Sequence, residues 1–284
     1  MNKNLLSFYG LKWNPFAPDL PTEACRVTPR VEHFCQRMES LAREGGYALV
    51  TGDPGTGKSV ALRILVSRLG GLRDVTVGVL TRPQGTEADF YRELGAIFGV
   101  ALSPHNRWAG ANVLREMWKA HIEASLLRPV LVVDEAQQMR DSVFDEMRLL
   151  TAAKLDAQSL LTVVLAGDLR LVERLRESDL TALASRIRVR LPLDVVSSAE
   201  LAEYLRHATA AAGNSNLMTA ELVSTLAEHA AGNLRLLMNL SAELLEAGAK
   251  KELARLDEKL YLEVFSLPSS EAGRKRSATA AGAR

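Results

Sequence analysis

The segment Ala48-Leu-Val-Thr-Gly-Asp-Pro-Gly-Thr-Gly-Lys-Ser-Val60 decides the fold of this 284-residue chain. It contains the pattern G-x-x-x-x-G-K-[ST], whose specified residues are Gly52, Gly57, Lys58 and Ser59. An apolar run leads into the pattern and a helical pattern follows it, which is the context that a phosphate-binding loop requires. A glycine-rich turn between a strand and a helix is the alternative. Every specified position is matched and both flanks fit, so the phosphate loop is the better interpretation.

The residue types of this loop suit a polyphosphate. Glycines let successive backbone N–H groups turn inward on phosphate oxygens, and the following helix adds the positive end of its dipole. Lys58 is expected to reach the β- and γ-phosphates, and the Ser59 hydroxyl is expected to hold Mg²⁺. The residues expected to bind the nucleotide are Gly52, Asp53, Pro54, Gly55, Thr56, Gly57, Lys58, Ser59 and Val60.

Composition indicates an ordinary globular protein. Hydrophobic residues make up 47% and charged residues 24% of the chain, and the formal net charge is +1, which neither favours nor excludes a nucleic-acid partner. No apolar run approaches the roughly 18 residues of a membrane span, and the polar start does not resemble a signal peptide, so a cytoplasmic protein is expected. Cys25 and Cys35 match no metal or redox spacing and are expected to be reduced thiols.

Short apolar or alternating runs separated by helical patterns predict a layered α/β domain with a parallel sheet. Asp141 is expected to cap a helix that carries Phe144, Met147 and Leu150. The predicted strands are Val75 to Thr81, Pro129 to Ala136, Leu160 to Ala166 and Arg186 to Leu193, together with the run before the phosphate loop.

The pattern becomes entirely helical from Ser197, which with Glu200 forms a predicted capping box. We therefore expect an aromatic arm at 1–28, an α/β ATPase domain at 29–195, a helical lid domain at 196–267 and a disordered tail at 268–284. The arm could pack on the core or contribute to the purine pocket, because ligand pockets use aromatic walls.

Asp134 and Glu135 supply the second half of a nucleoside triphosphate site. They end an apolar strand, and ligands of parallel sheets bind at the carboxyl ends of the strands. Asp134 is expected to help hold Mg²⁺ by accepting hydrogen bonds from its water ligands. Glu135 is expected to orient and deprotonate the attacking water. An acidic pair at a strand end is a modest signal by itself, but its combination with the phosphate loop is strong.

These motifs resemble those of AAA+ ATPases, with Walker A at Gly52 to Ser59 and Walker B at Leu131 to Glu135, followed by a small helical lid. The resemblance covers about residues 5 to 265 and implies a P-loop ATP hydrolase that uses ATP and Mg²⁺. It also implies a homo-oligomer, either a ring or a helical filament.

The resemblance assigns roles to further residues. Asp168 lies where the family has a polar sensor, although Asn or Thr is commoner there. Arg186 lies where the family has an arginine finger that reaches a neighbour's γ-phosphate, with Arg188 as the fallback; alternating arginines could also be a solvated face of a strand. Arg235, in Gly232-Asn-Leu-Arg235, matches the sensor-2 motif of the lid.

The aromatic start followed by this ATPase resembles the ExeA type, which includes secretion ATPases and transposition helpers of the TnsC, TniB and MuB kind. Because the chain stops after the lid, we expect a transposition regulator that assembles with ATP on double-stranded DNA and recruits a transposase. Candidate DNA contacts are Arg140, Arg148 and Lys154, any of which could equally be a solvated surface charge. The alternative is a secretion-type ATPase that remodels or assembles protein partners without DNA.

Overall fold

A computed structural model describes residues 3–100, 107–124, 127–153 and 158–265. It divides into two compact units. An α/β unit comprises Pro21–Val196 together with Asn233–Arg235, and a helical unit comprises the first twenty residues, Ser197–Gly232 and the chain from Leu236 onward. The expected tail at 268–284 and the candidate DNA contact Lys154 lie outside the described residues.

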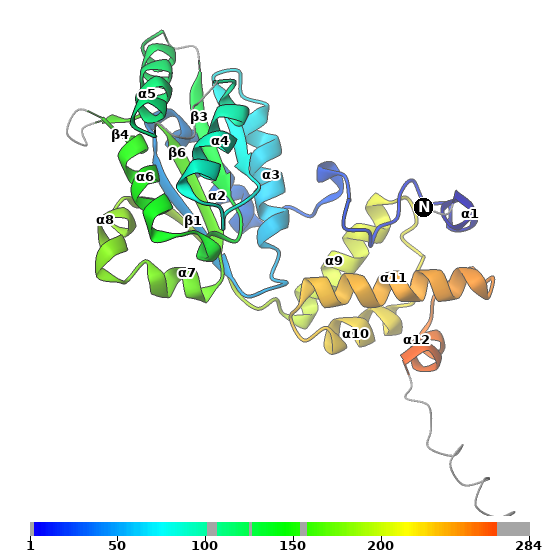
Figure 1. Ribbon diagram of the computed structural model, residues 1–284. Coiled ribbons are helices and arrows are strands. Elements are labelled where there is room, and N and C mark those ends of the chain that lie inside the picture. Colours follow the sequence, from blue (N-terminus) through cyan, green and yellow to red (C-terminus); the bar gives the residue numbers. More distant parts are fainter. Residues whose placement is uncertain (1–2, 101–106, 125–126, 154–157, 266–284) are drawn as a thin grey trace, which may run out of the picture. The chain divides into compact units, whose positions relative to one another are not determined.

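The α/β unit is built on a five-stranded parallel sheet with the order β2-β3-β6-β1-β7 (Figure 1). This confirms the predicted α/β fold class. The strands are β1 (Gly46–Gly52), β2 (Val75–Leu80), β3 (Arg128–Val133), β6 (Thr162–Gly167) and β7 (Ile187–Leu193), and a separate short antiparallel pair is formed by β4 (Ala152–Ala153) and β5 (Gln158–Ser159).

Two apolar cores hold the layers of this unit together. On β1, Tyr47 and Leu49 belong to one core, whereas Ala48 and Val50 belong to the other. The central strands read as continuous apolar runs because both of their faces are buried. The first core is shared with α4 (Glu87–Phe98), α5 (Arg107–Glu123) and α6 (Asp141–Thr151), and the second with α2 (Pro29–Glu44) and α3 (Lys58–Gly70).

Side chains at helix starts define several of these boundaries. Thr86 and Asp89 form a capping box at the start of α4. The prediction that Asp141 caps α6 is wrong: Arg140 is the N-cap residue and makes no side-chain cap bond. Asp141 is the first helical residue and forms an ion pair with Arg174 of α7 (Leu169–Arg174). The short helices of this unit are η1 (Thr22–Ala24), η2 (Ala136–Gln138), η3 (Ser178–Leu180) and α8 (Thr181–Ala184).

The helical unit contains α1 (Lys3–Tyr9), α9 (Ser198–Ala211), α10 (Ala220–His229), most of α11 (Leu234–Lys250) and α12 (Glu258–Phe265). The capping box of Ser197 and Glu200 is present, as predicted. The aromatic start of the chain packs within this unit: the buried Tyr9 accepts a hydrogen bond at its carbonyl from Asn214 (2.9 Å), and Lys12 N–H donates to the Ala212 carbonyl (2.9 Å).

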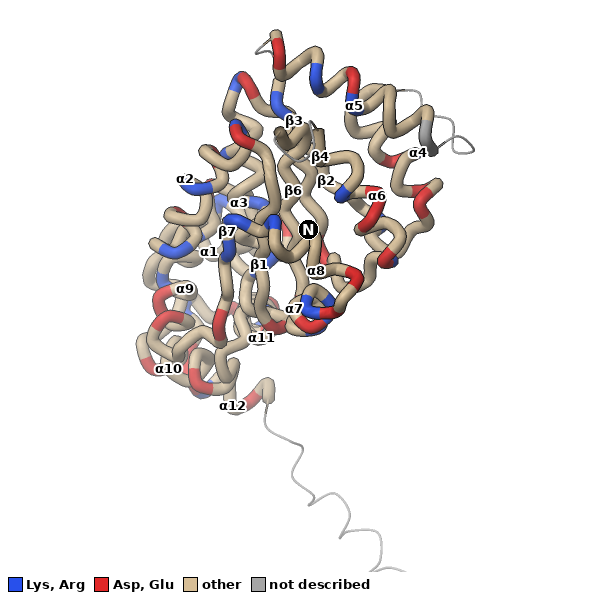
Figure 2. Tube along the Cα trace, turned by 90° about the vertical axis from the view of Figure 1, so that its left-hand side faces the viewer, with Lys and Arg blue, Asp and Glu red and all other residues tan. Residues whose placement is uncertain are grey.

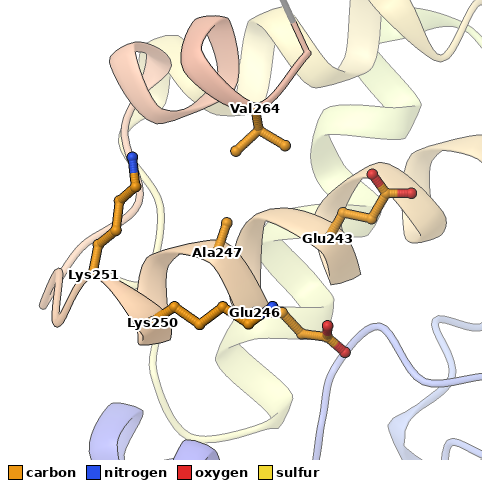
Figure 3. A pocket seen from close by; sticks show the side chains of 6 residues that line it. All are labelled: Glu243, Glu246, Ala247, Lys250, Lys251 and Val264. Atoms are coloured by element: carbon orange, nitrogen blue, oxygen red, sulfur yellow. The ribbon is translucent and has the colours of Figure 1, made fainter.

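A shallow hollow of the helical unit lies between α11 and α12 (Figure 3). Both acidic and basic side chains line it, and Lys251, one of the lining residues, forms an ion pair with Glu263. It includes none of the phosphate-loop residues. Within the part of the chain that the structure describes, no helix is both long and apolar enough to cross a lipid bilayer.

Candidate nucleotide-binding site

The predicted phosphate loop and acidic residues meet at one edge of the sheet. Strands β3, β6 and β1 are neighbours in the sheet, and all three are parallel. The phosphate loop follows β1, Asp134 and Glu135 follow β3, and Asp168 follows β6. Three segments that are far apart in the sequence therefore end at the same carboxyl edge, where parallel sheets bind their ligands.

Steric constraints explain the glycines of the loop. Gly55 and Gly57 have φ of 90° and 99°, a region that L side chains rarely adopt. A Cβ atom on Gly52 would lie 2.5 Å from the carbonyl oxygen of Leu193, so no larger residue fits there without movement. Thr56 Oγ1 donates to the Asp53 carbonyl at 2.8 Å and closes the turn. The loop is thus a tight cradle whose shape depends on residues without side chains.

Lys58 and Ser59 carry the polar chemistry of the loop. The Lys58 ammonium donates to the carbonyls of Gly52 (2.7 Å) and Asp53 (3.0 Å), and the residue is 7% exposed. Ser59 Oγ donates to Asp134 Oδ2 at 2.9 Å, which joins the two predicted metal-binding residues. A hydroxyl beside a carboxylate is an oxygen-donor set of the kind that Mg²⁺ prefers, usually completed by water and substrate phosphates. These residues fit the ion.

Glu135 lies next to this pair in an unusual backbone conformation. Its φ is 53°, in the left-handed region that residues other than glycine seldom occupy, and its N–H donates to Asp134 Oδ1 at 2.9 Å. Its exposed carboxylate accepts a hydrogen bond from Gln137 Nε2 at 2.6 Å. Strained conformations of this kind persist where the surrounding contacts enforce them, and they cluster at functional sites.

Asp168 lies at the same edge but is held by a neighbour. Its carboxylate caps α7 by accepting from Arg170 N (3.0 Å) and also accepts from the Arg170 guanidinium (2.6 Å from the nearest nitrogen). These hydrogen bonds hold the pKa of Asp168 below its usual value, and the charge of Lys58 acts in the same direction. An aspartate at this position is therefore a charged partner of Arg170, which distinguishes it from the neutral Asn or Thr that is commoner in the family.

Asn233 and Leu234 contact the phosphate loop. Leu234 N–H donates to the Gly55 carbonyl at 2.9 Å, and a Cβ on Gly55 would lie 2.2 Å from Asn233 Oδ1. Arg235, the predicted sensor-2 residue, follows directly and is exposed. The sequence stretch around Arg235 is thus brought to the loop, although the contacts that bring it there belong to the two preceding residues.

Arg186 is not brought to the site of its own chain. It immediately precedes β7, whose Ile187 pairs with Tyr47 at the amino end of β1. The phosphate loop lies at the opposite end of that seven-residue strand, about 20 Å away at ~3.3 Å per residue. The fallback residue Arg188 is paired with Glu44 at the same amino edge.

The two candidate DNA contacts within the described residues lie at opposite ends of α6. Arg140 precedes the first residue of α6, whereas Arg148 lies in its last turn and is 3.7 Å from Asp145 in an ion pair. Basic positions also occur on α2, where acidic ones are interspersed, and on β7 (Figure 2). Three of the arginines there form ion pairs: Arg30 with Asp194, Arg43 with Asp74, and Arg188 with Glu44.

Three further polar residues at the site were not singled out from the sequence. They are Gln137, Arg170 and Arg174, the last of which donates to the carbonyls of Gln137 and Met139 at 2.7 Å each. Their positions, three to seven residues after the end of a strand that an acid follows, are the only sequence signal that could have drawn attention to them. Of the three, Arg174 bonds a separate segment of the chain, and a contact of that kind leaves no local pattern.

The five-stranded parallel sheet and the C-terminal helical region, together with these motifs, resemble the AAA+ class of P-loop proteins. Consistent with this class, residues 42–175 match the protein-family model described as "AAA domain". The matched segment is a little under half of the chain and contains the phosphate loop and both acidic residues that follow β3.

The chain is also similar in sequence to a curated secretion-pathway protein. General secretion pathway protein A of Aeromonas hydrophila is 32% identical over 210 residues, which are 72% of this chain and 38% of that protein. The chain therefore matches well under half of the length of this relative. The sequence shares distant homology with it, in agreement with the predicted ExeA type.

Solved structures confirm the fold. The Aeropyrum pernix ORC2 protein, in a structure with ADPNP and ADP, superposes with a TM-score of 0.72 at 14% identity and covers 93% of this chain and 75% of its own. Drosophila ORC bound to DNA gives a TM-score of 0.67 at 19% identity, over 92% of this chain and 65% of its own. At these identities the likeness concerns the fold alone.

Proposed function

We propose that this protein is a Mg²⁺-dependent ATP hydrolase whose nucleotide cycle controls its assembly with protein partners. The hydrogen bond between Ser59 Oγ and Asp134 Oδ2 carries the proposal, because it joins the phosphate loop to the acidic strand end as one oxygen-donor site. Lys58 on one side and Glu135 on the other complete the set of groups that hydrolysis of a phosphoanhydride needs.

Each residue has a distinct part in the reaction. The backbone N–H groups of the loop and Lys58 bind and orient the β- and γ-phosphates, and Ser59 and Asp134 hold Mg²⁺. When bound, Mg²⁺ neutralises charge on the phosphate oxygens. Glu135 orients a water and accepts its proton as the water oxygen attacks the γ-phosphorus and the bond to the ADP oxygen breaks. Asp168, fixed by Arg170, supports this edge of the site.

Two arginines complete the proposed chemistry. Arg235 acts from the same chain, next to the residues that contact the phosphate loop. Arg186 acts on the nucleotide of a neighbouring copy, since it lies at the opposite edge of the sheet from its own phosphate loop. An arginine finger supplied in trans is worth ~10³–10⁵ in rate, so hydrolysis should depend on a homo-oligomer, whether a ring or a helical filament.

Protein partners are the preferred targets of this cycle. The support is the name of the curated relative, a general secretion pathway protein, which points to secretion rather than to transposition. Assembly on double-stranded DNA with recruitment of a transposase is the second candidate. It is supported by the likeness in fold to an ORC assembly bound to DNA, and that support is at the level of fold only.

Steady-state hydrolysis and nucleotide binding test the enzymatic part. Lys58→Ala should lose ATP binding, because the loop loses its cation for the phosphates. Glu135→Gln should bind ATP with parent affinity and hydrolyse it at least ~100-fold more slowly, since only the proton acceptor is removed. Equal hydrolysis by Glu135→Gln and the parent would refute the role assigned to Glu135.

Electron microscopy with a non-hydrolysable ATP analogue, with and without duplex DNA, tests the partner class. Nucleotide-driven oligomers that ignore DNA support the protein-directed function. Filaments or rings that require DNA, with an affinity that falls steeply as salt rises, would favour the second candidate.

A further inference from the structure

A buried glutamine lies behind the proposed water-activating carboxylate. Gln137 belongs to the short helix η2, and its Nε2 donates to Glu135 Oε2 at 2.6 Å. Gln137 is only 9% exposed, whereas Glu135 is exposed at the carboxyl edge of the sheet. The bond therefore joins a fixed interior group to a carboxylate that would otherwise have several rotamers available in solvent.

Neighbouring groups fix the Gln137 side chain and backbone. Arg174 donates to the Gln137 carbonyl at 2.7 Å, which anchors η2 to α7. A Cβ atom on Gly167 would lie 2.5 Å from Gln137 Oε1, so the amide occupies space that only a glycine at the end of β6 leaves open. Gln137 has little freedom to move away from Glu135.

The amide oxygen of Gln137 also indicates that this side chain does more than fill space. Its Oε1 is buried and has no hydrogen-bond partner among the described residues. A buried polar atom without a partner destabilises the fold, so an apolar residue would be the better choice if Gln137 only filled space. The amide is retained where its Nε2 meets the carboxylate of Glu135, which argues for a function of that one bond.

We propose that Gln137 is a positioning residue that aligns the Glu135 carboxylate for attack by water, an inference that rests on the proposed hydrolytic role of Glu135. Glu135 occupies a left-handed backbone conformation (φ 53°), and a hydrogen bond from a neutral donor holds one of its two carboxylate oxygens. In this role Gln137 acts through Glu135, and its neutral amide removes no charge from the base. Small misplacements of a reacting group cost up to ~10²-fold in rate.

The decisive variant is Gln137→Glu, measured by single-turnover hydrolysis of ATP from pH 5.5 to 9.5 on the full chain. It puts a second carboxylate beside Glu135, and two carboxylates in contact raise the pKa of one of them. The rate at pH 7 should fall about 10-fold, and the acid limb of the profile should move up by about one pH unit or more. A merely structural role would lower the ATP affinity together with the rate, and a side chain out of contact with Glu135 would leave the limb in place.

Gln138→Glu is the matched control, because it makes the same change one residue away at an exposed position. Its profile should superpose on that of the parent. Gln137→Met keeps the length of the side chain but cannot donate; it should lower the single-turnover rate about 10-fold, leave ATP affinity within about twofold and leave the acid limb in place. If Gln137→Glu does not fold, this second variant decides the question.

The outcomes separate the two proposals. If Glu135→Gln is slow while Gln137→Glu and Gln137→Met hydrolyse ATP with the parent rate and profile, the positioning role is wrong and the hydrolytic role of Glu135 stands. If Glu135→Gln hydrolyses ATP as fast as the parent, the proposed role of Glu135 fails first. Parent-like binding of a fluorescent ATP analogue by each variant shows that the phosphate loop is intact.

Discussion

Individual residues at this site are selected by backbone geometry as much as by chemistry. Gly55 and Gly57 have positive φ, and Gly52 leaves no space for a Cβ atom. Glu135 has a positive φ without being a glycine, as fits the proposed role of its carboxylate. A contiguous motif of eight positions can predict a phosphate loop, because the backbone conformation is local. The same motif cannot predict which side chain will bond to Glu135.

Burial lowers the reactivity of the Cys35 thiol. Cys35 is 0% exposed, and burial raises its pKa to about 11. Because only the thiolate reacts, about one thiol in a thousand is reactive at pH 8. We expect iodoacetamide at pH 8 to alkylate Cys35 at least ~100-fold more slowly in the native protein than in urea. Peptide mass spectrometry measures the two rates. Rates that match in the two conditions would mean that α2 opens readily.

At the scale of elements, α7 holds the loop between β3 and α6 in place. The Arg174 guanidinium bonds the carbonyls of Gln137 and Met139, pairs with Asp141 and lies 5.3 Å from the centre of the Phe144 ring. One side chain thus satisfies backbone groups that no regular helix or strand reaches. The conformation of η2, and with it the orientation of Gln137, depends on a residue from another element.

Arg174→Met should therefore destabilise the protein. Two carbonyls lose their charged donor, and their partial burial makes the loss cost about 1–3 kcal/mol in the free energy of unfolding. Urea denaturation followed by circular dichroism measures the change. Arg176→Met, at an exposed position two residues further on, is the matched control and should change stability by less than ~0.5 kcal/mol. Equal effects of the two substitutions would contradict the anchoring role of Arg174.

Several strands and helix starts were predictable from the sequence. The runs at Val75 to Thr81 and Pro129 to Ala136 correspond to β2 and β3, and Ser197 with Glu200 starts α9. These features are local, because burial and capping leave periodic or short-range patterns. The N-cap of α6 was predicted one residue late, since the Asp141 carboxylate is drawn to Arg174 from 33 positions along the chain.

On the scale of the whole molecule, the sequence could not reveal contacts made over long separations. The Asn233 and Leu234 contacts with the phosphate loop join residues more than 170 positions apart. Neither residue carries a motif of its own beyond its place before Arg235. The pairing of Asp168 with Arg170 was missed for a different reason: the two are close in sequence, but a short acid-to-base spacing after a strand is common on protein surfaces.

Substitution of Arg186 tests whether hydrolysis depends on contact between neighbouring copies of the protein. Arg186→Ala should bind ATP with parent affinity but lose hydrolysis, because its guanidinium serves a neighbour's site. Mixing it with Lys58→Ala should restore part of the activity, since interfaces form in which an intact Lys58 faces an intact Arg186. Hydrolysis is measured against the mixing ratio, with each variant alone as the baseline.

Arg188→Ala is the control for this mixing experiment, because Arg188 lies two residues away on the same strand and is paired with Glu44. It should keep hydrolysis close to that of the parent. No recovery in the mixture, together with loss of activity in Arg188→Ala, would move the finger role to Arg188. Loss of ATP binding in Arg186→Ala would show that the residue has been misassigned.

The path of the chain through the two units has a consequence for anyone who wishes to dissect this protein. The α/β unit runs from Pro21 to Val196 and then takes up Asn233–Arg235, after the chain has passed through part of the helical unit. An expression fragment that ends at Val196 would keep the whole matched AAA segment and every Walker residue. It would still lack the amide that caps Gly55, so weak nucleotide binding by such a fragment would reflect where it was cut.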